Sequence, residues 1–337
     1  MNLDKLNAVA EAMVADNKGL LAADESTGTI AKRLASINVE ASEDNRRAYR
    51  ELLFRAKGSG KYVSGAILYD ETIRQKAEDG TPLIDLMKAE GIMPGIKVDM
   101  STKPLPGSPG ETITEGLDGL PGRVDEYVKL GATFAKWRAV IAIGDGKPSQ
   151  NAIEINAHLL ARYAKICQEG GLVPIVEPEV LMDGDHTIDT CEEVTEQTLH
   201  TTFMQLYKQG VKFEGMILKP NMVIAAKDCS KQAAVDEVAA RTVALLRRCV
   251  PSAVPGIMFL SGGQSEAEAT AHLNAMNKNF AAQPWKLSFS YGRALQQSAL
   301  QAWLGKDANV PAAQQAYLER AKQNSLACAG KAPAEAA

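Results

Sequence analysis

The amino-acid sequence predicts an α/β fold, a single (β/α)8 TIM barrel with an extra helix near each end of the chain. Short apolar runs rich in β-branched and aromatic residues recur, and each is followed by a longer amphipathic helical pattern, which is typical of parallel βα units. Eight such runs are present, the number of strands that closes a barrel of this kind. A length of 337 residues also suits one α/β barrel, so we expect one domain over 1–337.

The eight predicted strands are short and mostly apolar, with charged residues near several of their carboxyl ends. They span residues 19–24, 65–69, 94–98, 134–139, 172–179, 215–219, 256–261 and 286–291. In a barrel strand, alternate side chains point inward, so inward residues near the carboxyl ends should converge on one site.

The helices between the strands have recognisable ends. We expect Ser149 to cap a helix that reaches Gly170, Gly210 to end a helix that starts at Glu192, and Ser265 with Glu268 to form a capping box. Residues 2–16 predict a leading helix and residues 311–327 a trailing helix, followed by a mobile tail over 328–337. The Pro- and Gly-rich segment 101–122 is expected to be an irregular loop over the barrel mouth.

Composition narrows the class of partner. Hydrophobic residues make up 45% and charged residues 23%, and the net charge of −4 offers no general attraction to nucleic acid. The five cysteines are widely spaced without CxxC pairs, and the sequence shows neither a signal-peptide pattern nor an apolar run long enough to span a membrane. We therefore expect a cytoplasmic protein that binds a small molecule.

Ionisable residues stand at the ends of three consecutive predicted strands. Lys136 and Arg138 share one face of the fourth strand, Glu177 and Glu179 share one face of the fifth, and Lys219 ends the sixth. Burying an unpaired charge costs several kcal/mol, roughly, so these groups should meet and compensate one another. A purely structural layer of ion pairs is the alternative, but so many strand-end charges favour a catalytic site.

Lys219 is the candidate nucleophile. A lysine beside another cation in a partly apolar pocket has its ammonium form destabilised, which leaves free amine to attack a carbonyl group. Lys136 supplies the neighbouring charge, and Glu177 and Glu179 are placed to move protons. Asp24 ends the first strand as a further candidate base, and Lys97 on the third is a further cation.

The seventh and eighth predicted strands lead into glycine-containing turns and then helices. Ser261 and Ser290 lie near the ends of these strands, and Gly262, Gly292 and Arg293 lie in the turns. Glycine lets backbone N–H groups approach an anion, and TIM barrels frequently bind phosphate after these two strands. The turns therefore predict a phosphate site.

Other chemistries have little support. The four histidines, His158, His186, His200 and His272, show no HExxH or similar ligand spacing, and no GxGxxG, GxxxxGK or GxSxG motif is present. We therefore expect no metal site and no cofactor.

Several motifs resemble those of one known family, the class I, metal-independent fructose-bisphosphate aldolases. They are Leu21-Ala22-Ala23-Asp24-Glu25-Ser26-Thr27-Gly28, Gly95-Ile96-Lys97-Val98-Asp99, Phe134-Ala135-Lys136-Trp137-Arg138, Val176-Glu177-Pro178-Glu179, Leu218-Lys219-Pro220-Asn221-Met222, Leu260-Ser261-Gly262-Gly263-Gln264 and Ser290-Tyr291-Gly292-Arg293. The resemblance runs from about residue 17 to residue 331. It implies a (β/α)8 barrel that reversibly cleaves fructose 1,6-bisphosphate into dihydroxyacetone phosphate and glyceraldehyde 3-phosphate.

The same resemblance implies a role for each candidate residue. Lys219 forms the imine with the ketose, Glu177 is the acid and base of imine formation, and Asp24 takes the C4 hydroxyl proton. Lys136 is the nearby ammonium, and Glu179 supports the network. Lys97 and Arg138 are at implied substrate-binding positions. Ser261, Gly262, Gly292 and Arg293, together with the neighbouring Ser290, are implied at the phosphate nearest the ketone, and Ser26, Thr29 and Arg33 at the other end.

Two alternatives remain open at the level of sequence. One is another Schiff-base aldolase or a transaldolase acting on a different sugar phosphate, and the other is a barrel kept as a scaffold or binding protein. The resemblance also implies a homo-oligomer, tetrameric in the family, but does not choose between fructose 1,6-bisphosphate and fructose 1-phosphate. Eukaryotic members end in a catalytic tyrosine, whereas the last tyrosine here, Tyr317, falls in a predicted helix.

Overall fold

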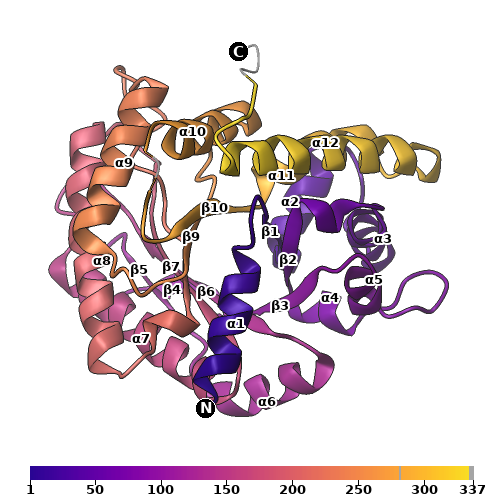
Figure 1. Ribbon diagram of the computed structural model, residues 1–337, viewed down its shortest axis with the longest axis horizontal. Coiled ribbons are helices and arrows are strands. Elements are labelled where there is room, and N and C mark those ends of the chain that lie inside the picture. Colours follow the sequence, from indigo (N-terminus) through magenta and orange to yellow (C-terminus); the bar gives the residue numbers. More distant parts are fainter. Residues whose placement is uncertain (281, 334–337) are drawn as a thin grey trace.

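The centre of the molecule is a closed barrel of eight parallel strands, seen in a computed structural model that describes residues 1–280 and 282–333 (Figure 1). Each barrel strand pairs with the next one along the chain, and the last pairs with the first. All eight lie within two residues of their predicted bounds, which confirms the (β/α)8 fold. The strands are β1 (Gly19–Ala23), β2 (Val63–Leu68), β3 (Met93–Lys97), β6 (Phe134–Ile141), β7 (Val173–Val180), β8 (Ile217–Leu218), β9 (Gly256–Phe259) and β10 (Lys286–Tyr291).

Helices surround the barrel, and α7 (Gln150–Glu169), α8 (Ile188–Lys208) and α9 (Val235–Cys249) lie side by side along one flank (Figure 1). The helices are α1 (Leu3–Met13), α2 (Thr27–Ala35), α3 (Glu43–Phe54), α4 (Asp70–Arg74), α5 (Leu83–Ala89), α6 (Leu120–Leu130), α7 (Gln150–Glu169), α8 (Ile188–Lys208), α9 (Val235–Cys249), α10 (Glu266–Asn279), α11 (Arg293–Trp303) and α12 (Val310–Cys328). Three short 3₁₀ turns are also present in the described residues, at Ser59–Lys61, Phe213–Gly215 and Asp307–Asn309.

The predicted helix caps are mostly confirmed. The Ser149 side chain accepts a hydrogen bond from the backbone N–H of Ala152 at the start of α7, and Ser265 and Glu268 form the expected capping box of α10. The predicted start of α8 was wrong. This helix begins at Ile188 and not at Glu192, because the Thr187 side chain already caps it.

The segment 101–122 is more regular than predicted. It contains the antiparallel pair β4 (Thr102–Pro104) and β5 (Thr112–Thr114), and its last residues form the first turn of α6. A proline in that turn explains the helix start, because proline lacks an N–H group that the first turn would leave unbonded in any case.

The barrel interior has two layers. The lower layer is apolar and includes Leu20, Ile67, Phe134, Ile175 and Ile217, and it is continuous with the buried face of α1, which closes that end of the barrel (Figure 1). Gly65 and Gly95 make room for the Phe134 ring, since a Cβ atom on Gly95 would lie 2.0 Å from it. Inward residues above this layer, towards the carboxyl ends of the strands, are charged. The apolar floor therefore fixes the strands that carry the charges.

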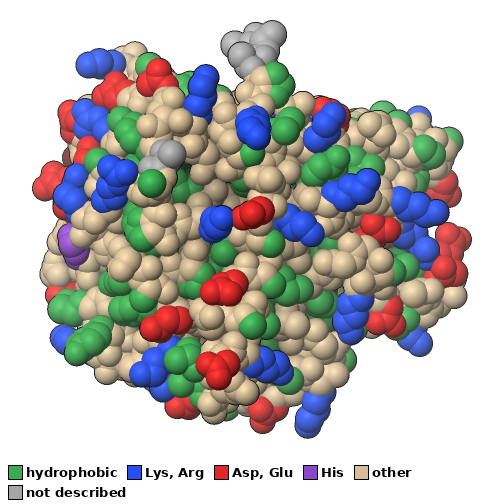
Figure 2. All heavy atoms as spheres, in the orientation of Figure 1, with side chains coloured by type: hydrophobic (Ala, Val, Ile, Leu, Met, Phe, Trp, Pro, Cys, Tyr) green, Lys and Arg blue, Asp and Glu red, His purple; other side chains and the backbone are tan. Residues whose placement is uncertain are grey.

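On the face of the molecule shown in Figure 2, acidic and basic side chains are interspersed, so this face has no large patch of one charge. No helix in the described residues is long and apolar enough to cross a bilayer.

At the end of the described chain, Cys328, which the sequence predicted to lie in a mobile tail, is the last residue of α12. Beyond it, Lys331 and Ala332 donate backbone hydrogen bonds to Leu326 O and Asn274 Oδ1, each 2.9 Å long. Residues 334–337 of the predicted tail lie outside the described residues.

Candidate active site

A cavity of about 770 Å³ lies at the carboxyl ends of the barrel strands. Every site residue proposed from the sequence lines it. These residues are Asp24, Ser26, Thr29, Arg33, Lys97, Lys136, Arg138, Glu177, Glu179, Lys219, Ser261, Gly262, Ser290, Gly292 and Arg293. The inward-facing residues near the carboxyl ends of separate strands therefore meet in one cavity, as the alternation of side chains along the strands predicts.

A second cavity, of about 630 Å³, lies at the opposite end of the barrel. Its lining includes Pro255 and Lys286, at the amino ends of β9 and β10, and Asp16 from the segment that follows α1. Asp16 and Lys286 pair with each other there, 2.7 Å apart and largely exposed to solvent. The buried Lys136, Glu177, Glu179 and Lys219 all line the first cavity, which is therefore the candidate active site.

Lys136 lies at the centre of a buried charge cluster. Its Nζ atom is 2.7 Å from Asp24 Oδ2, 3.4 Å from Glu177 Oε2 and 3.9 Å from Asp99 Oδ2. The Lys136 residue is only 4% exposed, so three carboxylates surround an ammonium that water barely reaches. The cluster ties the ends of β1, β3, β6 and β7 to one point.

Lys219 follows β8 directly and faces the same cluster. Its Nζ atom lies 3.2 Å from Glu177 Oε1, and both residues are almost fully buried. Glu177 therefore stands between two lysines, with one carboxylate oxygen towards each. Its Oε2 atom makes no hydrogen bond within the described part of the chain, so this oxygen has capacity for a substrate proton.

The electrostatics fix which groups are charged near neutral pH. Burial alone would raise the pKa of Asp24, but the Lys136 ammonium, through its charge and a hydrogen bond, outweighs burial and lowers that pKa from 3.8 to about 2. Burial likewise opposes the charged form of Lys136, but Asp24 and Glu177 outweigh burial and raise the pKa of that ammonium above its ordinary value. Asp24 is therefore a carboxylate and Lys136 a cation in the folded protein.

Two further ion pairs lie at the cavity wall. Arg138 Nε donates to Glu179 Oε2 across neighbouring strands, while Lys97 Nζ lies 2.7 Å from Asp99 Oδ1. Asp99 also accepts a hydrogen bond from the Arg138 backbone N–H, 3.2 Å away, on its other carboxylate oxygen. Asp99 thus connects Lys97 to the β6 strand, and the cation Lys97 keeps a defined position.

The turns after β9 and β10 form one side of the cavity and carry groups that suit an anion. Gly262 and Gly263 have φ values of +50° and +81°, in the left-handed region that favours glycine. Arg293 is the first residue of α11, so the N–H groups of that helix end open towards the cavity. Ser290 Oγ is buried and has no hydrogen-bond partner among the described residues, although it lines the cavity. These groups together suit a phosphate.

Helix α2 supplies the facing wall. Ser26 Oγ and Thr29 Oγ1 lie 3.2 Å apart on its first turn. Arg33 lies two turns from Ser26, and a Cβ atom on Gly292 would be 3.4 Å from its Nη2 atom. The two groups of proposed anion-binding residues therefore approach each other at Arg33.

The residues that fix the carboxyl end of β1 were not predicted from the sequence. Glu25 is 7% exposed and pairs with Arg33, while its backbone carbonyl accepts a hydrogen bond of 2.8 Å from Arg50 Nη2. Gln296 Nε2 donates to both Ala22 O and Glu25 Oε1, at 2.7 and 3.1 Å. The only available signal was the position of Glu25 beside Asp24, since Arg50 and Gln296 are far away in the sequence.

Tyr317 does not take part in this site. It is fully buried on α12, its hydroxyl group has no hydrogen-bond partner among the described residues, and it is absent from the cavity lining.

Comparisons with known proteins agree with the geometry. A family profile described as fructose-bisphosphate aldolase class-I matches residues 5–337. A probable class 1 fructose-bisphosphate aldolase of Xanthomonas axonopodis pv. citri (strain 306) is 58% identical over 333 residues, 98% of this chain and 99% of the relative. The cytosolic fructose-bisphosphate aldolase 6 of Arabidopsis thaliana is 57% identical over 327 residues, 97% of this chain and 91% of that one.

A solved structure extends the likeness to three dimensions. A fructose-bisphosphate aldolase of Plasmodium falciparum, crystallised with TRAP and a small-molecule inhibitor, superposes with a TM-score of 0.97 at 50% sequence identity, over 99% of this chain and 96% of that one. Fold, family profile and relatives thus agree along nearly the whole length. The chain therefore belongs to the class I fructose-bisphosphate aldolase family, lyases that reversibly cleave fructose 1,6-bisphosphate into dihydroxyacetone phosphate and glyceraldehyde 3-phosphate through a lysine Schiff base.

Proposed function

We propose that Lys219 is the Schiff-base lysine and that Glu177 transfers the protons of imine formation. The observation that carries this proposal is the position of Glu177 between two lysines, 3.2 Å from Lys219 Nζ and 3.4 Å from Lys136 Nζ. Glu177 accepts the proton that the Lys219 amine loses as it attacks the ketone carbon. The same carboxyl group then protonates the carbinolamine hydroxyl, which leaves as water.

Asp24 acts in the cleavage step. Its carboxylate, ionised at neutral pH, removes the proton of the C4 hydroxyl, and the C3–C4 bond breaks as that oxygen becomes a carbonyl. The electron pair moves into the protonated imine, which is a better electron sink than a neutral ketone. Lys136 remains an ammonium beside Asp24 and holds that carboxylate in place.

The two anion-binding walls position the substrate ends. Ser261, Gly262, Ser290, Gly292 and Arg293 would hold the phosphate near the ketone. The remaining binding residues, Lys97, Arg138, Ser26, Thr29 and Arg33, line the rest of the cavity. Two walls of this kind favour a bisphosphate over the monophosphate of a transaldolase substrate, and an intact charge cluster favours an enzyme over a scaffold.

Steady-state cleavage assays test the assignment. We expect Lys219→Ala to reduce kcat for fructose 1,6-bisphosphate by at least about 10³-fold, as loss of a covalent nucleophile does. The matched control is Lys165→Ala, which removes a lysine on the outer helix α7 and should leave kcat unchanged. Near-normal activity in Lys219→Ala would overturn the proposal.

The second anion site is tested by comparing two ketoses. Ser26→Ala should raise KM for fructose 1,6-bisphosphate and leave KM for fructose 1-phosphate unchanged, because only the first substrate has a phosphate at that end. An equal rise in both KM values would mean that Ser26 contacts a part that the two substrates share, and not the second phosphate.

Three broader properties also belong to the proposal. We infer one domain, since a single barrel contains eight of the ten described strands. We also infer a cytoplasmic location, in line with five free cysteines and cytosolic plant relatives, and a homo-oligomer. Light scattering on the purified chain measures the oligomer, and a mass equal to one chain would contradict it.

A further inference from the structure

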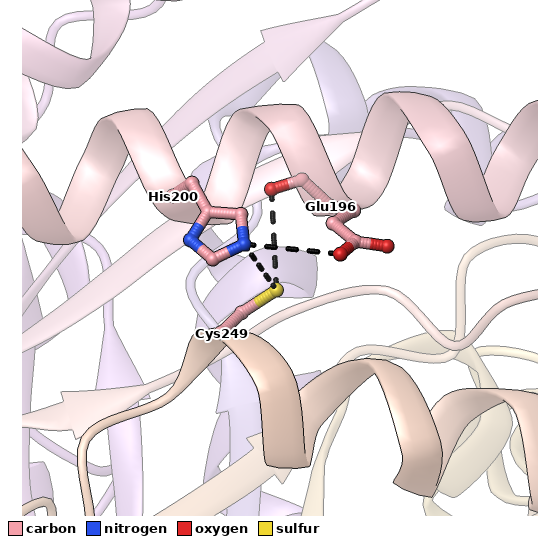
Figure 3. Close-up of side chains that lie close together, drawn as sticks. All are labelled: Glu196, His200 and Cys249. Atoms are coloured by element: carbon pink, nitrogen blue, oxygen red, sulfur yellow. Dashed lines mark hydrogen bonds and ion pairs between the residues drawn. The ribbon is translucent and has the colours of Figure 1, made fainter.

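Three metal-ligating side chains meet on the outside of the barrel, away from the catalytic cavity. Figure 3 shows Glu196 and His200 on one helix and Cys249 on another, with the Cys249 sulfur below the imidazole ring. One ligand atom from each lies within 4.8 Å of the other two, and this is the one such group of three in the described residues. None of the three lines the active-site cavity.

The packing of two neighbouring helices brings these three side chains together. Glu196 and His200 are one turn apart on α8, so their side chains project from the same helix face. Cys249 is the last residue of α9, which packs beside α8. Cys249 lies 49 residues beyond His200, so no local spacing of histidines or cysteines indicates the cluster.

The spacing of the ligand atoms suits a tetrahedral ion. Cys249 Sγ lies 3.6 Å from His200 Nε2, and that nitrogen lies 3.8 Å from Glu196 Oε1. A tetrahedral Zn²⁺ with bonds of about 2.3 Å to sulfur and about 2.0 Å to nitrogen holds those two atoms about 3.5 Å apart. The sulfur and nitrogen therefore already have the separation that an ion requires, and the carboxylate oxygen, within 4.8 Å of both, moves closer when the ion binds.

Access and charge also permit an ion. The side chains of His200 and Glu196 are 56% and 32% exposed, so solvent reaches the cluster, while Cys249 is buried beneath them. Glu196 at present pairs with Arg248, at 2.6 Å, and an incoming cation must compete for this carboxylate. Arg248 has a second partner in Glu192 Oε1, 3.0 Å away, so it keeps an ion pair when Glu196 turns to the metal.

We propose that Glu196, His200 and Cys249 form a site for one Zn²⁺ ion, with water as the fourth ligand. A thiolate, an imidazole and a carboxylate form a donor set that suits zinc and disfavours magnesium and calcium. On binding, the Cys249 thiol releases its proton to solvent and the sulfur bonds to the metal. The ion joins α8 to α9, the two helices that follow β7 and β8, so its role is structural and separate from the aldol reaction.

Metal titration of the full chain tests the site. After chelator treatment, we expect one equivalent of Zn²⁺ to bind and to raise the midpoint of thermal unfolding, because the ion binds only the folded state. With Co²⁺ as a spectroscopic probe, we expect a thiolate-to-metal charge-transfer band in the near ultraviolet. Zn²⁺ should also protect Cys249 from alkylation, as read by peptide mass spectrometry.

Matched variants separate this cluster from other ligands. Cys249→Ala and His200→Ala should each abolish the charge-transfer band or weaken binding at least tenfold. The controls Cys229→Ala and His158→Ala remove a thiol and an imidazole outside the cluster and should bind like the unaltered chain. All four variants should retain aldol cleavage, which shows that they fold. A charge-transfer band that persists in Cys249→Ala, or no band in the unaltered chain, would overturn the proposal.

Discussion

Glu177 Oε1 lies 3.2 Å from Lys219 Nζ, and both side chains are buried and line the cavity. A carboxyl group so close to the nucleophile can take and return a proton without a bridging water.

Replacement of Glu177 by Gln should slow imine formation more than it harms folding, because the amide keeps the shape of the side chain but cannot shuttle a proton. We expect kcat to fall about 10²–10⁴-fold, with the loss in the pre-steady-state rate of imine formation. The control Glu169→Gln changes an exposed glutamate on α7 and should behave like the unaltered enzyme. A normal rate of imine formation in Glu177→Gln would assign this proton transfer to another group.

Asp24→Asn should separate the two halves of the reaction. Lys219 and Glu177 remain, so the imine with fructose 1,6-bisphosphate should still form, but C3–C4 cleavage should stop because an amide cannot accept the hydroxyl proton. Quenching with borohydride should trap the six-carbon adduct on the variant. Recovery of three-carbon product at the normal rate would contradict the role of Asp24.

Acid stability should depend on the same residue. The pKa of Asp24 is depressed from 3.8 to about 2, so its contribution is fully present above pH 3.8 and is lost as the pH falls towards 2. The stabilisation is on the order of 2 kcal/mol. Denaturant titrations should therefore show that the stability difference between the unaltered chain and Asp24→Asn shrinks across this window, and a constant difference would argue against the shift.

The buried His272 should make the free energy of unfolding depend on pH in a second range. Its Nδ1–H donates to Gln264 Oε1 at 2.6 Å, and burial lowers its pKa from 6.5 to about 4, although Glu268 partly opposes this shift. The folded state resists protonation that the unfolded chain accepts, so stability falls as the pH drops from 6.5 towards 4, by an amount on the order of 3 kcal/mol. His272→Asn should flatten the curve of unfolding free energy in this range, whereas parallel curves would contradict the linkage.

The turn at Gly263 allows a prediction about substrate binding. Gly263 has φ +81°, and a Cβ atom there would lie 2.6 Å from Met182 Sδ, whereas Gly184 has φ +99° with nothing within 4 Å. Both alanine variants suffer the backbone strain of about 1 kcal/mol, but only Gly263→Ala places a methyl group 3.4 Å from Arg293 Nη2 at the cavity and should raise KM. Equal KM values in the two variants would show that the turn does not contact substrate.

The strands and the site were predictable because their signal is local. The apolar runs and the parity of Lys136, Arg138, Glu177 and Glu179 can be read within a few residues, and a barrel then forces such positions to one end. The pair β4 and β5 escaped prediction since each strand has three residues, largely outside the apolar core, and therefore no hydrophobic period.

Partnerships across the fold could not be read in the same way. Nothing near Glu25 in the sequence indicates Arg50 or Gln296, because those contacts exist only after α3 and α11 pack against the end of β1. The meeting of Cys249 with His200 likewise depends on the packing of α9 beside α8.

Trapping of the imine tests the central claim most directly. The enzyme is incubated with dihydroxyacetone phosphate, reduced with borohydride and digested, and the modified peptide is identified by mass spectrometry. We expect one adduct per chain, on Lys219, and none in Lys219→Ala. An adduct on Lys136, or an unmodified chain under conditions in which it turns over, would contradict the account.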